Sequence, residues 1–388
     1  MKRNIYLAYF LAAVKNSWFW LGVWVLYYLR FTDYSGIGLI ETVGITIGTL
    51  AEIPTGAIAD LVGKKKTLIL AFFLEAFGSF IMSFAQNFGQ IIISVVVMWA
   101  GGALYSGTLD ALVFDSLKQE GKEDKYGKII ANIASISLIS MAIASIFGGF
   151  MYSFSFRLPF IANSIGYLLG FIASFILIEP KIDTIKFSWR NYLLQTRQGF
   201  KQLFQPLAKL KTIRLLILGA FLTVLTEILD SVLLVEVGFS DRQMGIIFAI
   251  IYLISSATSQ ISPWLKSKFG YSWSINILNL FIVIALLIMP KANLFIGGSA
   301  ILLIENILPI FNNLSSEMIN KQTESKYRAT TISTFNMLKN LPYVLTAAFI
   351  GRLMDIISAR HFAFYFGLAL LAVLLLQKLT LDKKKSIR

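Results

Sequence analysis

The chain has 388 residues, of which 56% are hydrophobic and only 14% are charged. A soluble protein of this length needs a surface richer in charged side chains, so the composition excludes a soluble globular fold. The formal net charge of +14 would suit a nucleic-acid-binding protein, but the placement of the basic residues argues against that class. The chain has no Cys, which excludes disulfides and thiolate metal sites.

Apolar segments long enough to cross a bilayer recur along the whole chain. A hydrocarbon core of about 30 Å requires about 20 apolar residues per helix, and Gly, Pro and charged residues separate twelve such segments. We therefore predict an all-α membrane protein with twelve transmembrane helices. The predicted helices cover residues 5–29, 36–60, 67–86, 88–117, 127–154, 157–178, 211–236, 243–264, 272–290, 293–318, 328–354 and 360–380.

The distribution of basic residues predicts the orientation of these helices. Of the 35 Lys and Arg residues, 27 fall on the side of the predicted membrane that also holds both termini. Such an excess marks the cytoplasmic side, so we expect both termini in the cytoplasm and the protein in a bacterial plasma membrane. The first segment is longer than the about 7–15 apolar residues of a signal peptide, so we expect it to remain as a helix.

Two six-helix bundles are predicted, residues 1–178 and 211–388, joined by residues 179–210. The joining segment is basic, and its apolar residues recur mostly at three- and four-residue steps. This pattern indicates an amphipathic linker helix on the cytoplasmic surface of the membrane.

The two predicted bundles resemble each other in sequence, which indicates a duplicated unit. FTDYSGIG at 31–38 is similar to FSDRQMG at 239–245, and DKYGKII at 124–130 is similar to SKYRATT at 325–331. In transporters, such repeats rock about a site that they hold between them.

The segment GAIADLVGKKK, residues 56–66, carries a motif. It resembles the G-x-x-x-D-[RK]-x-G-[RK]-[RK] signature between helices 2 and 3 of the major facilitator superfamily, although Leu61 replaces the usual basic residue. The helix number, the repeat and the basic central loop fit that family, and EIPTGAIAD, LYSGTLDALVFDSL and SKYRATTIST resemble its bacterial drug or macrolide exporters. The resemblance implies a conformational latch that stabilises the outward-facing state. Its residues would be Gly56, Asp60, Gly63, Lys64 and Lys65. Asp115 is expected to meet lysines of this loop.

Two departures from the family pattern concern proton coupling. Antiporters of the family often carry a G-P pair in helix 5, where this chain has Ala144 and Ser145. Many exporters also have an Arg in helix 4, where VVVMWAGGALYSG is uncharged. Proton coupling would therefore have to use other groups.

Acidic residues inside predicted helices mark a transport pathway or a paired structural site, because charge is costly within the membrane. Glu227 and Asp230 lie three residues apart on one helix face, and carboxylates so close disfavour double ionisation, as proton coupling requires. Glu305 lies near the middle of its helix, and Asp110 shares a face with Gly102 and Ser106. The candidate proton-coupling residues are Glu305, Asp110, Glu227, Asp230 and Glu52. Structural pairing remains the alternative for Asp110 and Glu52, and contact with external water for the Glu227–Asp230 pair.

Polar and aromatic residues in the predicted helices provide candidates for a substrate cavity. Lys15 and Lys339 lie within helices, where an ion pair that holds helices together is the alternative role. The aromatic run SWFWLGVW offers a wall for lipophilic cations, or an anchor facing lipid. The candidate cavity residues are Lys15, Trp20, Asn306, Asn312, Asn336, Lys339 and Tyr343.

These patterns predict an alternating-access transporter that exports lipophilic, cationic small molecules in exchange for protons. Acids outnumber bases within the predicted helices, which favours cationic substrates. Uptake by proton symport and a non-transporting membrane sensor are the alternatives. We expect a monomer whose partners are a small-molecule substrate, protons and the lipid bilayer. We expect no nucleic-acid binding, cofactor, metal site or enzymatic activity.

Overall fold

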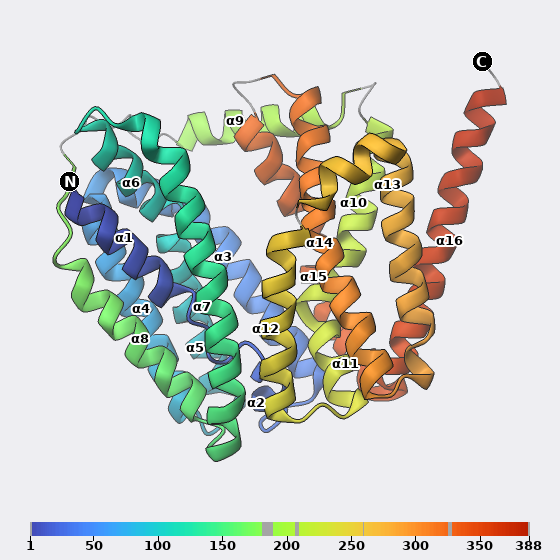
Figure 1. Ribbon diagram of the computed structural model, residues 1–388, viewed down its shortest axis with the longest axis horizontal. Coiled ribbons are helices and arrows are strands. Elements are labelled where there is room, and N and C mark those ends of the chain that lie inside the picture. The colour runs from blue at the N-terminus through green and yellow to red at the C-terminus, as the bar shows by residue number, and fades with distance from the viewer. Residues whose placement is uncertain (1, 181–188, 206–208, 259, 325–327, 387–388) are drawn as a thin grey trace. The chain divides into compact units, whose positions relative to one another are not determined.

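The computed structural model describes residues 2–180, 189–205, 209–258, 260–324 and 328–386, and its regular structure in these ranges is helical (Figure 1). Within these ranges, the side chains of residues 52–61, 189–193, 195–196, 256, 272, 329–330 and 378–386 lie outside the description.

Each predicted membrane segment overlaps one helix or consecutive helices. The predicted boundary between 243–264 and 272–290 is wrong, because residues 261–271 form the first part of α13. The first half comprises α1 (Lys2–Lys15), α2 (Trp24–Tyr28), α3 (Tyr34–Val62), α4 (Lys64–Phe84), α5 (Phe88–Tyr105), α6 (Thr108–Lys118), η1 (Glu123–Lys125), α7 (Tyr126–Phe154) and α8 (Leu158–Ser174). The predicted linker contains α9 (Trp189–Leu203). The second half comprises α10 (Lys209–Val224), a π-helical segment (Leu225–Leu229), α11 (Asp230–Val237), α12 (Asp241–Thr258), α13 (Ile261–Leu287), η3 (Met289–Lys291), α14 (Leu294–Gln322), α15 (Arg328–Ile357) and α16 (Ala359–Ser386).

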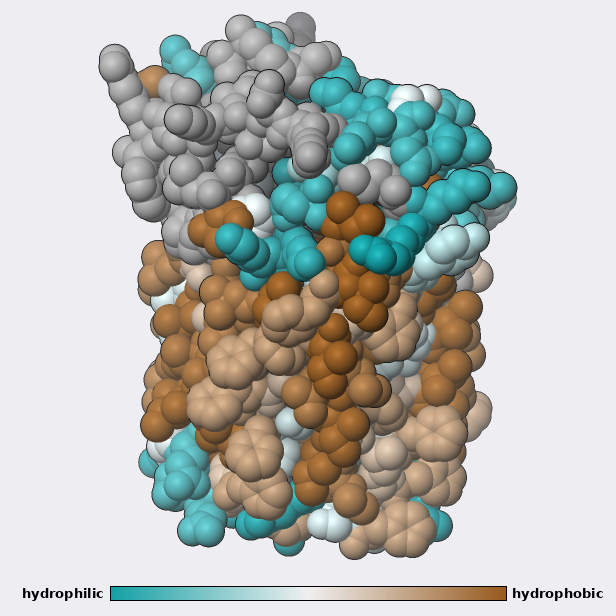
Figure 2. Space-filling view, turned by 90° about the vertical axis from the view of Figure 1, so that its left-hand side faces the viewer, coloured by the Kyte–Doolittle hydropathy of each residue, from teal (hydrophilic) through white to brown (hydrophobic). Residues whose placement is uncertain are grey.

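The fold is that of a membrane protein. Within the described residues, eight helices are long and apolar enough to cross a bilayer. α13 is bent by 107° between Ile261–Tyr271 and Trp273–Leu287, and a ninth span results if these two parts are counted together. The other predicted segments correspond to the interrupted α1–α2 pair, the shorter α8, and α12. Figure 2 shows a broad apolar band with hydrophilic residues at both of its ends. Exposed apolar side chains such as Phe77 on α4 and Ile172 on α8 face outward, as they do in lipid.

The chain forms two compact units. Unit 1 contains Met1–Thr32, Leu39–Tyr192 and Ser240–Leu253, and unit 2 contains Asp33–Gly38, Leu193–Phe239 and Ile254–Arg388. Unit 1 thus includes the start of α12, where Gly245 accepts a hydrogen bond of 2.9 Å from the Ser145 hydroxyl. Unit 2 includes the first turn of α3, whose backbone N–H groups at Tyr34 and Ser35 donate to the Asp355 carboxylate.

The prediction of one continuous helix over residues 5–29 is wrong. α1 ends at Lys15, residues 16–23 form a series of turns, and α2 begins at Trp24. The Asn16 amide donates to the carbonyl of Ala12 and the Ser17 hydroxyl to that of Ala13, both at 2.8 Å. Short polar side chains that bond the backbone in this way offer an alternative to the helical hydrogen bonds, which explains the break.

The predicted helix over residues 88–117 is also interrupted. α5 ends at Tyr105, and Gly107 has a φ of 70°, a left-handed conformation that glycine adopts without steric penalty. α6 therefore starts as a separate helix, and Asp110 lies in its first turn. The expectation that Gly102, Ser106 and Asp110 share one helix face is wrong, because they do not belong to one continuous helix.

Candidate functional site

A buried ion pair joins α1 to α4 in unit 1. The ammonium of Lys15 lies 2.6 Å from Oε1 of Glu75, which is 3% exposed. Lys15 is the last residue of α1, where a positive charge compensates the negative end of the helix dipole. The sequence prediction chose Lys15 but overlooked Glu75, although a lone Glu in the apolar run TLILAFFLEAFGSF is itself a signal for an intramembrane site.

Aromatic rings surround this ion pair. The Lys15 ammonium lies 5.5 Å from the ring centroid of Tyr105 and 5.7 Å from those of Trp18 and Tyr167. Trp20 stacks on Trp18 at a centroid distance of 5.4 Å, and its buried Nε1 has no hydrogen-bond partner. A carboxylate together with aromatic faces is suited to an organic cation, and here Lys15 itself fills that place.

Asp110 lies at the edge of the same region. It is exposed, and it interacts electrostatically with Tyr105, one of the rings beside Lys15. The helix break at Gly107 thus places this candidate near the Lys15–Glu75 pair without burying it.

Three of the candidate acids come together in unit 2. Glu305 on α14 interacts electrostatically with both Glu227 and Asp230, which also interact with each other. Asp230 is 4% exposed, and Oε1 of Glu305 is buried without a hydrogen-bond partner. Holding three carboxylates close together inside a membrane protein is costly unless protons or cations neutralise them.

Lys339 on α15 brings one positive charge to these acids. Its charge interacts with Glu227, and its aliphatic stem packs against Gly219 on α10. A Cβ at Gly219 would lie 2.5 Å from Cγ of Lys339, so only glycine leaves room for the lysine there. Glu227, Asp230, Glu305 and Lys339 form what we call the acidic cluster, with three acids and one base.

Both acid-bearing segments of the acidic cluster depart from regular α-helix. Glu227 lies in the π-helical segment Leu225–Leu229, a rare conformation that is frequent at functional sites. On α14, Pro309 follows Glu305 by four residues and cannot donate the hydrogen bond that the Glu305 carbonyl would otherwise accept. The backbone is therefore irregular where the carboxylates gather.

The remaining polar candidates of unit 2 have different environments. The Asn306 side chain is buried and accepts hydrogen bonds of 3.2 Å from the hydroxyls of Ser255 and Thr258 on α12. Tyr343 is also buried, Asn312 is half-buried and Asn336 is exposed.

The loop that carries the family motif is held by two acidic residues of unit 1. Gly63 has a φ of 99°, and the backbone N–H groups of Lys64 and Lys65 donate to the Glu179 carboxylate at 2.8 and 2.7 Å. The Lys64 ammonium lies 2.7 Å from Asp115, the expected partner of this loop. The side chains of three candidates on α3, namely Glu52, Gly56 and Asp60, lie outside the described residues.

Unit 2 repeats this ion pair. Lys266 lies 2.6 Å from Glu317, and both residues follow their counterparts Lys64 and Asp115 by the same 202 positions. A matching pair at a constant offset supports the duplication inferred from the sequence.

Comparison with known proteins agrees with this architecture. Residues 5–347 match the sequence model of the Major Facilitator Superfamily. The chain is 24% identical over 239 residues to the uncharacterized MFS-type transporter YxaM of Bacillus subtilis (strain 168), covering 59% of this chain and 57% of YxaM. It is 27% identical over 185 residues to the quinolone resistance protein NorA of Staphylococcus aureus, covering 42% of this chain and 46% of NorA. The chain thus matches about half the length of each relative.

Solved transporters share the fold. The nucleoside transporter NupG superimposes with a TM-score of 0.78 at 14% identity, covering 97% of both chains. A POT family transporter in complex with 5-aminolevulinic acid superimposes with a TM-score of 0.75 at 13% identity, covering 98% of this chain and 96% of the other. With this fold and a family match that spans most of its length, the chain belongs to the major facilitator superfamily of membrane transporters.

Proposed function

We propose that this transporter exports lipophilic cations from the cytoplasm in exchange for protons, and that it works by alternating access. The acidic cluster carries the proposal. With all its groups ionised, Glu227, Asp230 and Glu305 outweigh Lys339 by two negative charges. In a low-dielectric interior this excess must be balanced, either by protons on the carboxylates or by a bound cation.

Exchange follows from competition for the same carboxylates. Protons that enter from outside would neutralise the cluster and release a cationic substrate on that side. Loss of these protons to the cytoplasm would restore the negative charge and allow the next cation to bind. The carboxylates would bind either protons or the cationic substrate at any one time, and antiport requires this exclusion.

The relatives support transport, but they define neither its direction nor its substrate. NorA is a quinolone resistance protein, but the chain matches 46% of its length. Uptake by proton symport is the second candidate, favoured by Ala144 and Ser145 where antiporters of the family often carry a G-P pair. We further propose that both termini face the cytoplasm of a bacterial cell and that the protein acts as a monomer.

The test uses everted membrane vesicles that contain the protein and are acidified inside, with a pH-sensitive dye as reporter. Adding a lipophilic cation such as tetraphenylphosphonium should dissipate the proton gradient. Glu305→Gln should reduce this response at least about tenfold, because a neutral amide takes up no proton. An unchanged response in Glu305→Gln, Glu227→Gln and Asp230→Asn would overturn the role of the acidic cluster.

A matched control is available in a loop. A hydrogen bond from Lys122 lowers the pKa of Glu120 to about 2, so this carboxylate takes up no proton near neutral pH. Glu120→Gln should therefore retain the full response. The direction of transport is read separately with labelled cation: accumulation inside everted vesicles indicates export, whereas acid-driven loss from preloaded vesicles indicates uptake.

A further inference from the structure

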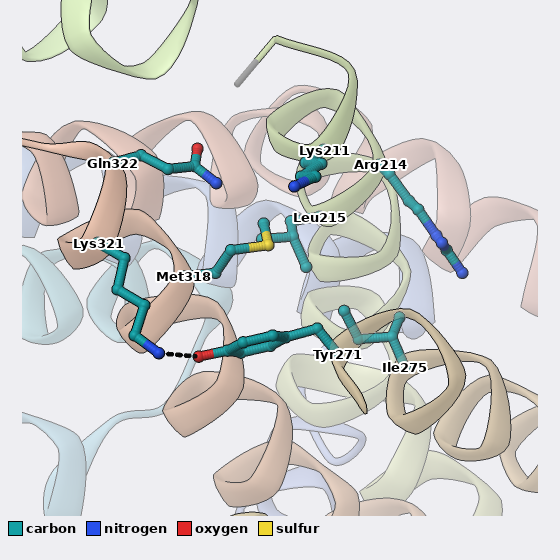
Figure 3. Close-up of a pocket in the computed structure, with 8 residues that line it drawn as sticks. All are labelled: Lys211, Arg214, Leu215, Tyr271, Ile275, Met318, Lys321 and Gln322. Carbon is teal, nitrogen blue, oxygen red and sulfur yellow. Dashed lines mark hydrogen bonds between the residues drawn. The ribbon is translucent and has the colours of Figure 1, made fainter. Parts of the chain in front are cut away.

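A cavity of about 300 Å³ lies in unit 2 where α10 begins and α14 ends (Figure 3). Helices α10, α13 and α14 line it. Its size is at the lower end of the about 300–1,000 Å³ of small-molecule sites. The acidic cluster contributes no residue to this lining, so the cavity is a separate feature of the unit.

The polar side of this cavity is basic. Lys211, Arg214 and Lys321 all line it, and no carboxylate does so among the residues that the structure describes. The nearby Glu317 is shared between Lys266 and Lys321, at 2.6 and 2.9 Å, which leaves an excess of positive charge. The guanidinium of Arg214 donates a hydrogen bond to Asn276, and its buried Nε has no hydrogen-bond partner. Its positive charge adds to that of the two lysines.

Apolar side chains also line the cavity, next to its basic residues. Figure 3 shows the polar ends of Lys211 and Gln322 turned toward each other near Met318 and Leu215. Ile275 on α13 completes the apolar lining. The cavity therefore suits a ligand with an anionic end and an apolar end.

The surroundings place the cavity at the depth of lipid headgroups. Tyr271 lines it and accepts a hydrogen bond of 3.3 Å from Lys321. Close to Tyr271 in the chain, Trp264 and Trp273 are 54% and 67% exposed. Exposed Trp side chains are typical of the interface between hydrocarbon and water, and basic pockets between helices at that level bind lipid phosphates.

We propose that this cavity binds the headgroup phosphate of an anionic phospholipid. Lys211 and Gln322 donate to the phosphate oxygens, and the positive field of Arg214 and Lys321 adds to the attraction. The glycerol and the first methylene groups lie against Leu215 and Met318. An inorganic phosphate ion offers the same oxygens, but it makes none of these apolar contacts.

The test measures thermal unfolding of the purified full-length protein in a neutral detergent. Dioleoyl phosphatidylglycerol, dioleoyl phosphatidylcholine or inorganic phosphate is titrated in. Phosphatidylglycerol should raise the unfolding temperature with saturation, and the other two should not at equal concentration. Lys211→Gln should weaken phosphatidylglycerol binding about tenfold, because one charge-assisted hydrogen bond is lost.

Two further variants keep the result decisive. Lys209→Gln removes the same charge from α10 at an exposed position outside the cavity lining, and its affinity should equal that of the unaltered protein. Gln322→Glu places a negative charge beside the phosphate and should abolish saturable binding. Equal affinity in Lys211→Gln and Lys209→Gln would overturn the proposal, as would equal stabilisation by inorganic phosphate, which would indicate a soluble anion instead.

Discussion

The ammonium of Lys15 lies 2.6 Å from a carboxylate oxygen of Glu75, at the point where the first membrane segment stops being helical. The pair connects the end of α1 to the middle of α4, and the faces of three aromatic rings surround its cation. Because Lys15 already balances Glu75, this carboxylate differs from those of the acidic cluster, which share a single lysine among three acids.

Breaking this ion pair should destabilise the protein. Lys15→Met or Glu75→Met leaves one buried charge without its partner, which should lower the free energy of unfolding by about 3–5 kcal/mol. The double variant Lys15→Met/Glu75→Met should recover most of that loss, because it leaves no buried charge. Unfolding of the purified protein in detergent, followed for all four forms, gives the coupling energy. Additive losses in the double variant would show that the pair contributes no mutual stabilisation.

Gly148 should tolerate no side chain. A Cβ there would clash with the carbonyl oxygen of Phe19, which lies in the turns between α1 and α2. Gly148→Ala should therefore destabilise the protein by about 1–3 kcal/mol, as overpacking of a tight contact does. Gly166 on α8 is the matched control, since a Cβ there meets nothing within 4 Å.

Gly166→Ala should be neutral or stabilise the protein by up to about 1 kcal/mol, because alanine favours the helix over glycine. The melting temperature and the folded yield from membranes measure both variants. If Gly148→Ala proves as stable as Gly166→Ala, α7 does not approach the backbone of Phe19 as closely as described.

Glu179 should stabilise the start of α4. Its carboxylate accepts hydrogen bonds from the N–H groups of Lys64 and Lys65, at the positive end of the helix dipole. Glu179→Ala should increase amide hydrogen exchange in the first turn of α4 about tenfold, which corresponds to about 1.4 kcal/mol. Glu123→Ala, in the loop before α7, is the control and should leave this exchange unchanged. Equal exchange in both variants would show that water replaces the carboxylate at no cost.

The positions of the membrane helices were predictable from the sequence. Apolar runs of about 20 residues have few alternatives to a membrane helix. Hydropathy, together with the Gly, Pro and charged residues between the runs, therefore located each predicted segment near an observed helix or helix pair. The breaks at residues 16–23 and at Gly107 were not predicted. The first break arises because the side chains of Asn16 and Ser17 form hydrogen bonds with the backbone that compete with the helix. The second arises from the left-handed conformation of Gly107. Hydropathy detects neither effect.

The candidate acids were predictable one by one, because a charge in an apolar run is costly and therefore conspicuous. Their assembly was not. Glu227, Glu305 and Lys339 lie on segments separated by tens of residues, and only the packing of α10, α14 and α15 around Gly219 brings them to one place. The pairing of Glu75 with Lys15 likewise depends on tertiary structure, because the two residues lie 60 positions apart on α1 and α4. The sequence by itself determined which residues are membrane-embedded and charged, whereas tertiary packing decided which of these charges neutralise one another, since electrostatic interaction depends on distance in space.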